Sequence, residues 1–199
     1  MLEKIKATAE FISKTTGFTP KTGIILGSGL GGLVKEIEIE KELNYADIPG
    51  FPVSTVKGHG NKLIFGTLNG VKVVAMQGRF HFYEGYSMQE VAMPVRVMKF
   101  LGIKNIILSN ASGGVNPKYK VGDLMILDDH INLMGTNPLI GPNNDDLGPR
   151  FPDMGEPYDK TMIKAAKAIA DKHGFTCHTG VYAAVTGPTF ETRAEYKYI

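Results

Sequence analysis

A short apolar segment that runs directly into a cluster of glycines is the feature that most constrains the fold. The stretch Gly23–Gly32 reads GIILGSGLGG. An apolar run bounded by turn residues is typical of a buried strand, and glycines let a backbone approach a ligand closely. Gly27, Gly29 and Gly32 match the G-x-G-x-x-G pattern of dinucleotide-binding loops, while Ser28 and nearby amides suit an oxyanion. The loop therefore has three interpretations: a tight turn, a phosphate site or a dinucleotide site.

The segment after this loop argues against a dinucleotide. A dinucleotide fold needs a full helix between the glycine loop and the next strand, in a unit of about 30 residues. Here Val34–Leu43 alternates apolar and charged residues, which predicts a strand with one exposed face. Only a short helical turn fits in between, so we favour phosphate as the ligand.

Strands alternate with helices along the chain, which predicts an α/β fold with a mostly parallel or mixed sheet, in a single domain over residues 1–199. Asn69-Gly70 between two apolar runs predicts a tight hairpin. We expect helices up to Gly17, over Ser87–Leu101 with a kink at Pro94, and over Tyr158–His173. We expect the other strands over Thr22–Leu26, Val53–Val56, Leu63–Leu68, Val71–Met76, Asn105–Leu108, Leu124–Leu127 and Val181–Val185.

Composition excludes several classes of protein. With 43% hydrophobic and 21% charged residues the chain is an ordinary globular protein, and a net charge of +2 without a basic block predicts no nucleic-acid or membrane partner. A single cysteine, Cys177, forms no internal disulfide, which fits a reducing cytoplasm. We expect no signal peptide in this sequence, and no apolar run in it reaches membrane length. Asp128, Asp129 and His130 point to alternate faces of a strand, so no metal site is expected.

Small or polar residues follow four of the expected strands. Ligand sites in α/β sheets gather beyond the carboxyl ends of strands, so we expect these loops to converge. They are Gly27–Gly32, Gln77–Gly85, Asn110–Gly114 and Thr186–Glu191.

Two of these loops carry candidate binding side chains. Arg79 and His81 both donate hydrogen bonds, and arginine suits phosphate; the alternative is a solvated loop in which Arg79 pairs with Glu84. Phe190 offers a flat ring and Glu191 a carboxylate to a heterocycle; the alternative is that Glu191 is an ordinary acid in the first turn of a helix. His59, between two glycines, is either a ligand contact or a surface histidine.

Taken together, these motifs resemble those of purine nucleoside phosphorylases of the trimeric class, over nearly the whole chain and in the family order. The matching segments are GIILGSGLGG, VKGHGN, QGRFHFYEGYSMQEVAMPVRVMKFLG, LSNASGGVNP, GDLMILDDHINLMGTNPLIGPN, GPRFPDM and TGPTFET.

The resemblance implies a mixed sheet distorted towards a barrel and surrounded by helices. It implies phosphate binding by Ser28, His59, Arg79, His81 and the backbone at Ala111. It also implies ribose contact by Tyr83, purine binding by Phe190 and Glu191, and catalytic roles for His81 and Glu191. Phe151 would reach a neighbouring subunit of a homotrimer.

The implied reaction is phosphate-dependent cleavage of nucleosides such as inosine and guanosine, with inorganic phosphate as co-substrate and no cofactor. The alternatives are a methylthioadenosine phosphorylase, a dinucleotide-binding module, or a fragment that only binds or assembles. Family members continue past Ile199, so we expect a C-terminal portion to be missing and the 199-residue chain to turn over little inosine.

Overall fold

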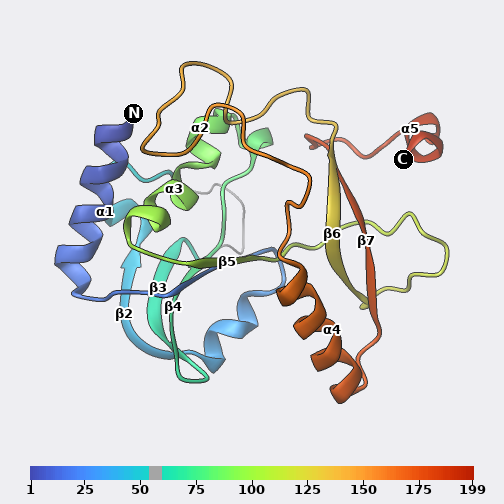
Figure 1. Ribbon diagram of the computed structural model, residues 1–199, viewed down its shortest axis with the longest axis horizontal. Coiled ribbons are helices and arrows are strands. Elements are labelled where there is room, and N and C mark those ends of the chain that lie inside the picture. The colour runs from blue at the N-terminus through green and yellow to red at the C-terminus, as the bar shows by residue number, and fades with distance from the viewer. Residues whose placement is uncertain (54–59) are drawn as a thin grey trace. The chain divides into compact units, whose positions relative to one another are not determined.

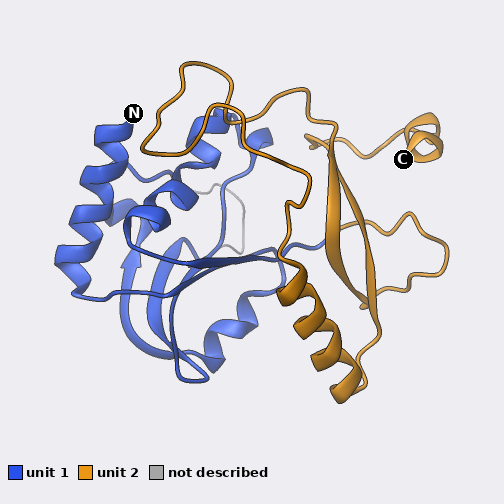
Figure 2. Cartoon of the chain, in the orientation of Figure 1, with its two compact units in different colours: residues 1–111 blue, residues 112–199 orange. Residues whose placement is uncertain are grey.

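The computed structural model describes residues 1–53 and 60–199. These residues form two compact units, Met1–Ala111 and Ser112–Ile199 (Figure 2). Both units combine helices with strands, so the α/β class predicted from the sequence is confirmed. The single domain over residues 1–199 stays a prediction. Among the described residues, no helix has the length and apolar character needed to cross a membrane.

A mixed sheet forms the centre of the first unit (Figure 1). Its order is β2-β3-β4-β1-β5, with β2–β3 and β3–β4 antiparallel and β4–β1 and β1–β5 parallel. Within the described residues the sheet is open, with β2 and β5 at its edges, and the expected barrel-like closure is not seen. The strands are β1 (Thr22–Leu26), β2 (Glu38–Asn44), β3 (Lys62–Leu68), β4 (Val71–Gln77) and β5 (Asn105–Leu108).

Helices α1 (Leu2–Thr16) and α3 (Met93–Phe100) pack on one face of this sheet. Alternate residues of β4 point to opposite faces. Val74 therefore joins the core beneath the helices, whereas Val73 joins a second, smaller core on the other face. Gly17 ends α1 in the left-handed conformation, with φ 62°, as the sequence predicts.

Three expected elements of this unit differ in part from the structure. Residues 34–36 belong to the 3-10 helix η1 (Gly31–Glu36), so β2 begins later than the alternating pattern suggests. The helix expected over Ser87–Leu101 is divided into α2 (Met88–Val91) and α3, because Pro94 fits the first turn of a helix better than its interior. Val53 is not in a strand, and residues 54–59 lie outside the described part.

Asn69 and Gly70 form the predicted hairpin between β3 and β4, with φ of 46° and 79°. These positive angles explain why the pair Asn-Gly is found there. Two further short 3-10 helices complete the unit: η2 (Tyr45–Asp47) and η3 (Phe82–Glu84).

The second unit is a pair of parallel strands joined through a helix. These elements are β6 (Leu124–Asn132), α4 (Lys160–His173) and β7 (Cys177–Ala184), followed by the short helix α5 (Arg193–Tyr198). Both strands are longer than expected. β6 continues through a bulge between Leu127 and Asp129 into polar residues, and β7 begins at Cys177 rather than at Val181. Among the described residues of this unit, Ala170 alone is buried.

Candidate functional site

The carboxyl ends of three neighbouring parallel strands meet at one edge of the first unit's sheet. Leu26 of β1 pairs with Gln77 of β4, and Ile25 pairs with Leu108 of β5. The loops that follow these strands, including the glycine loop, therefore start side by side, as the sequence predicts for three of its four candidate loops. The fourth, 186–191, belongs to the second unit.

Close backbone packing joins the ends of β1 and β5. The Ser109 amide donates to the Ile25 carbonyl at 3.0 Å, and the Ser109 hydroxyl donates to the same oxygen at 3.2 Å. A Cβ on Gly27 would lie 2.5 Å from the Ser109 carbonyl oxygen and 2.6 Å from the Asn110 Cα. Glycine is therefore required at position 27 by the protein's own packing.

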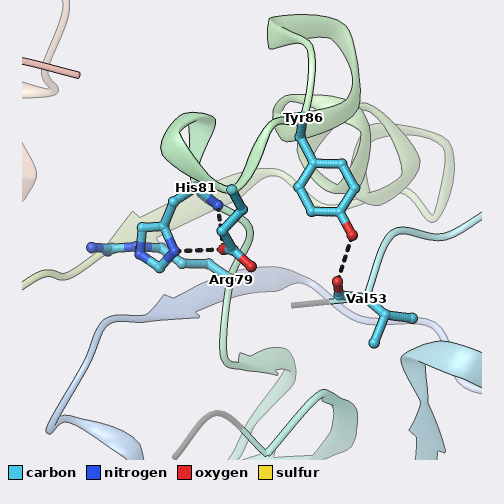
Figure 3. A network of polar contacts seen from close by, with 5 residues as sticks. Val53, Arg79, His81 and Tyr86 are labelled. Atoms are coloured by element: carbon cyan, nitrogen blue, oxygen red, sulfur yellow. Dashed lines mark hydrogen bonds and ion pairs between the residues drawn. The ribbon is translucent and has the colours of Figure 1, made fainter. Parts of the chain in front are cut away.

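A chain of hydrogen bonds organises the loop after β4 (Figure 3). Arg79 Nη1 donates to the Ser109 carbonyl at 3.0 Å, which connects this loop to the end of β5. Arg79 Nε donates to His81 Nε2 at 3.3 Å, and His81 Nδ1 lies 2.8 Å from Glu84 Oε1. These partners assign the neutral tautomer of His81 with its proton on Nδ1.

Glu84 is therefore a hydrogen-bond partner of His81, a pairing that the sequence did not indicate. The same carboxylate oxygen also accepts from the His81 amide at 2.9 Å, in a capping box that closes η3. The Glu84 side chain is only 2% exposed. Its spacing, three residues after His81, is that of a capping box and was the signal that sequence reasoning missed.

The remaining candidates of the first unit have different surroundings. Ser28 and Ala111 are exposed beyond the ends of β1 and β5, at the edge where the three loops start. Tyr83 is 44% exposed and stacks on the His81 ring, with centroids 4.7 Å apart. His59 lies outside the described residues.

The second unit holds the other candidates. Phe190 is 91% exposed and lines, with Glu191, a cavity of about 350 Å³. Glu191 precedes the Thr192 N-cap of α5, and Glu195 is the first-turn acid that completes the capping box. The alternative interpretation of Glu191 as that acid is therefore wrong.

The Glu191 carboxylate interacts instead with the Tyr196 hydroxyl, and this interaction raises the pKa of that tyrosine. Phe151 is 87% exposed, in the long loop before α4.

A histidine for which the sequence indicated no partner also has one in the structure. His178 Nε2 lies 2.7 Å from Asp123 Oδ2, and its ring stacks on Tyr119 at 4.1 Å. The hydrogen bond from His178, together with one from the Lys120 amide, lowers the pKa of Asp123. These residues join the turn before β6 to the start of β7, a structural role. In the described part of the chain, no group of histidine, cysteine and acidic side chains is arranged to hold a metal ion.

Comparisons with known proteins identify the family. The model of the phosphorylase superfamily matches residues 21–199. Purine nucleoside phosphorylase 1 of Bacillus subtilis is 57% identical over 199 residues, which cover 100% of this chain and 73% of the relative.

Two solved structures are similar along almost the whole chain. A purine nucleoside phosphorylase in complex with ribose 1-phosphate has a TM-score of 0.94 and 48% identity, covering 99% of this chain and 74% of that one. Isoform 2 of the Schistosoma mansoni enzyme, in complex with cytosine and ribose 1-phosphate, has a TM-score of 0.93 and 46% identity, covering 98% and 70%. The chain therefore belongs to the purine nucleoside phosphorylases of the phosphorylase superfamily.

Proposed function

We propose that this protein cleaves purine nucleosides such as inosine and guanosine with inorganic phosphate, giving the free purine and (deoxy)ribose 1-phosphate. The main observation behind the proposal is the series of hydrogen bonds from Arg79 through His81 to Glu84, in the loop that follows β4. This loop starts at the sheet edge where the glycine loop also begins. The names of the relatives and the ribose 1-phosphate in two similar structures support it.

Phosphate is assigned to the edge formed by β4, β1 and β5. Arg79 supplies a permanent positive charge and planar donors that suit phosphate oxygens. Ser28 adds a hydroxyl, and the amide at Ala111 adds a backbone donor. His81 provides a ring that changes from accepting to donating when it takes up a proton, and Glu84 stabilises that charge. His59 completes the proposed set.

The nucleoside is assigned to aromatic and acidic side chains. Tyr83, stacked on His81, contacts the ribose in this proposal. The exposed ring of Phe190 stacks on the purine, and Glu191 accepts hydrogen bonds from its N–H groups. In a homotrimer, which we also propose, Phe151 of one subunit reaches the nucleoside of another. We further propose that the protein acts in the cytoplasm and needs no cofactor.

The reaction proceeds by exchange at C1′ of the ribose. The C1′–N9 bond breaks and its electron pair leaves with the purine, which takes up a proton on a ring nitrogen. Positive charge develops on the ribose, and a phosphate oxygen forms the new bond to C1′. The residues above act by holding the reactants in line and by stabilising charge that develops in the transition state.

The test is formation of hypoxanthine from inosine by the full chain, followed by chromatography, together with calorimetric binding of phosphate and ribose 1-phosphate. We expect hypoxanthine to form only with phosphate present, and both anions to bind. Ser28→Ala should weaken phosphate binding about tenfold, the effect of one hydrogen bond to a charged group. If neither anion binds, or if inosine is cleaved without phosphate, the proposal is contradicted. If methylthioadenosine is cleaved in preference to inosine, the protein is a methylthioadenosine phosphorylase instead.

A further inference from the structure

A buried tyrosine holds the backbone at the start of the Arg79 loop. Tyr45, in η2, is 0% exposed, and its hydroxyl donates to the Gly78 carbonyl at 2.7 Å. Burial raises the pKa of the Tyr45 hydroxyl, so it stays protonated and able to donate. The Gly78 carbonyl is itself buried, and a buried acceptor that loses its donor costs the folded state free energy.

An aromatic cluster surrounds this hydrogen bond. It consists of Tyr45, Phe51, Phe80 and Tyr86. The Tyr45 ring lies 5.1 Å from Phe51 and 5.3 Å from Phe80, and Phe80 lies 5.9 Å from Tyr86, measured between centroids. These tilted and edge-to-face contacts fix the orientation of the Phe80 ring as well as its burial.

The position of Phe80 in the sequence connects the cluster to the candidate site. Phe80 is 4% exposed and stands between Arg79 and His81. His81 has an extended backbone, with φ −115° and ψ 148°, and successive side chains of an extended segment point to opposite sides. Holding Phe80 in the aromatic cluster therefore directs Arg79 and His81 away from the core and toward each other, where they are hydrogen-bonded.

We propose that Tyr45 is a positioning residue for phosphate binding, acting through the Gly78 carbonyl and the Phe80 ring to fix Arg79 and His81. This inference rests on the proposed function for its consequence, the phosphate affinity. Its structural part, control of the Arg79–His81 arrangement by Tyr45, stands on the hydrogen bond and ring contacts alone.

The test compares Tyr45→Phe with a matched control, Thr8→Val, in the full chain. Tyr45→Phe keeps the ring and removes only the hydroxyl. Thr8 is also buried, and its hydroxyl lies within hydrogen-bond distance of two carbonyl oxygens, that of Lys4 at 2.8 Å and that of Pro49 at 2.9 Å. Thr8→Val therefore removes a buried hydroxyl whose hydrogen bonds do not involve the Arg79 loop. The readouts are the calorimetric Kd for inorganic phosphate, the Kd for inosine, and the ring ¹⁵N signals of His81 measured by NMR.

We expect Tyr45→Phe to raise the Kd for phosphate about tenfold, to change the Kd for inosine less than twofold, and to shift the His81 ring signals. Thr8→Val should leave all three readouts as in the wild type. An equal loss of phosphate affinity in both variants, or unchanged His81 signals in Tyr45→Phe, overturns the inference. If the wild-type chain binds no phosphate, the proposed function fails, and the His81 signals still decide whether Tyr45 positions the loop.

Discussion

Replacing Gly27, Gly29 and Gly32 in turn by alanine tests whether the loop is shaped by the protein's own packing. In Gly27→Ala the new Cβ falls 2.5 Å from the Ser109 carbonyl oxygen and 2.6 Å from the Asn110 Cα. Both are backbone atoms, so the end of β5 must move. In Gly32→Ala the new Cβ meets no atom within 4 Å, and Gly32 has no positive φ.

The expected magnitudes differ accordingly. In Gly27→Ala, overpacking of this kind costs about 1–3 kcal/mol. Movement of Ser109 also weakens the 3.0 Å hydrogen bond that its carbonyl accepts from Arg79 Nη1. The free energy of unfolding of Gly27→Ala should therefore fall by about 3 kcal/mol. Gly29→Ala meets no neighbour but requires φ 79°, which costs a non-glycine residue about 1–2 kcal/mol. Gly32→Ala lies in η1 and should be neutral or stabilising by up to about 1 kcal/mol, because alanine restricts the unfolded chain.

Thermal unfolding followed by far-ultraviolet circular dichroism measures these differences; the chain has no tryptophan to report by fluorescence. For a chain of this size about 1 kcal/mol corresponds to 2–4 °C in Tm, so Gly27→Ala should unfold about 9 °C below the wild type. The order of Tm should be Gly27→Ala lowest, then Gly29→Ala, with Gly32→Ala at or above the wild type. If Gly27→Ala has the Tm of the wild type, or if Gly32→Ala lowers the Tm as much as Gly27→Ala does, the explanation of Gly27 by close backbone packing is refuted.

Two carboxylates, those of Glu84 and Asp123, allow equally direct tests. Glu84→Gln should lower the free energy of unfolding by about 1 kcal/mol, because neutral hydrogen bonds to His81 replace charge-assisted ones. Glu90→Gln changes the exposed capping box of α2 in the same way and should lower the free energy of unfolding less. A denaturant titration of both variants measures the difference. Asp123 has a lowered pKa in the folded state, so its contribution is complete above its ordinary pKa of 3.8 and is lost as the pH falls through the lowered value. The Tm of Asp123→Asn should therefore fall less than that of wild type between pH 5 and pH 3, and parallel curves would exclude a contribution from the Asp123–His178 contact.

Local sequence patterns predicted the parts of the fold that are determined locally. Thr22–Leu26 and Asn105–Leu108 are strands with the expected bounds, because apolar runs ended by small residues leave little alternative. The Asn69-Gly70 hairpin was predictable for the same reason, since its turn needs positive φ at both residues.

Other features depended on contacts between residues far apart in the sequence. Asp123 and His178 are 55 residues apart, and nothing in either segment indicates the other. Tyr45 and Gly78 are 33 residues apart, so the support for the Arg79 loop was also outside the reach of pattern reasoning. The second half of β6 was not predicted, because its residues are mostly polar. Most of that strand is exposed, so its apolar and polar residues alternate only weakly.

The glycine loop shows why a formal motif match needs a physical reason at each position. In a dinucleotide fold the third glycine permits close packing of a helix on a strand. Here Gly32 has open space around it and lies within a short 3-10 helix, η1. The first glycine, Gly27, is needed because β5 and the Arg79 side chain pack against it. Gly27 thus reflects the close approach of the segments at the ends of β1, β4 and β5, whereas Gly29 is favoured by its positive φ. The loop that these glycines shape carries Ser28 beyond the end of β1, at the edge where the Arg79 loop also starts.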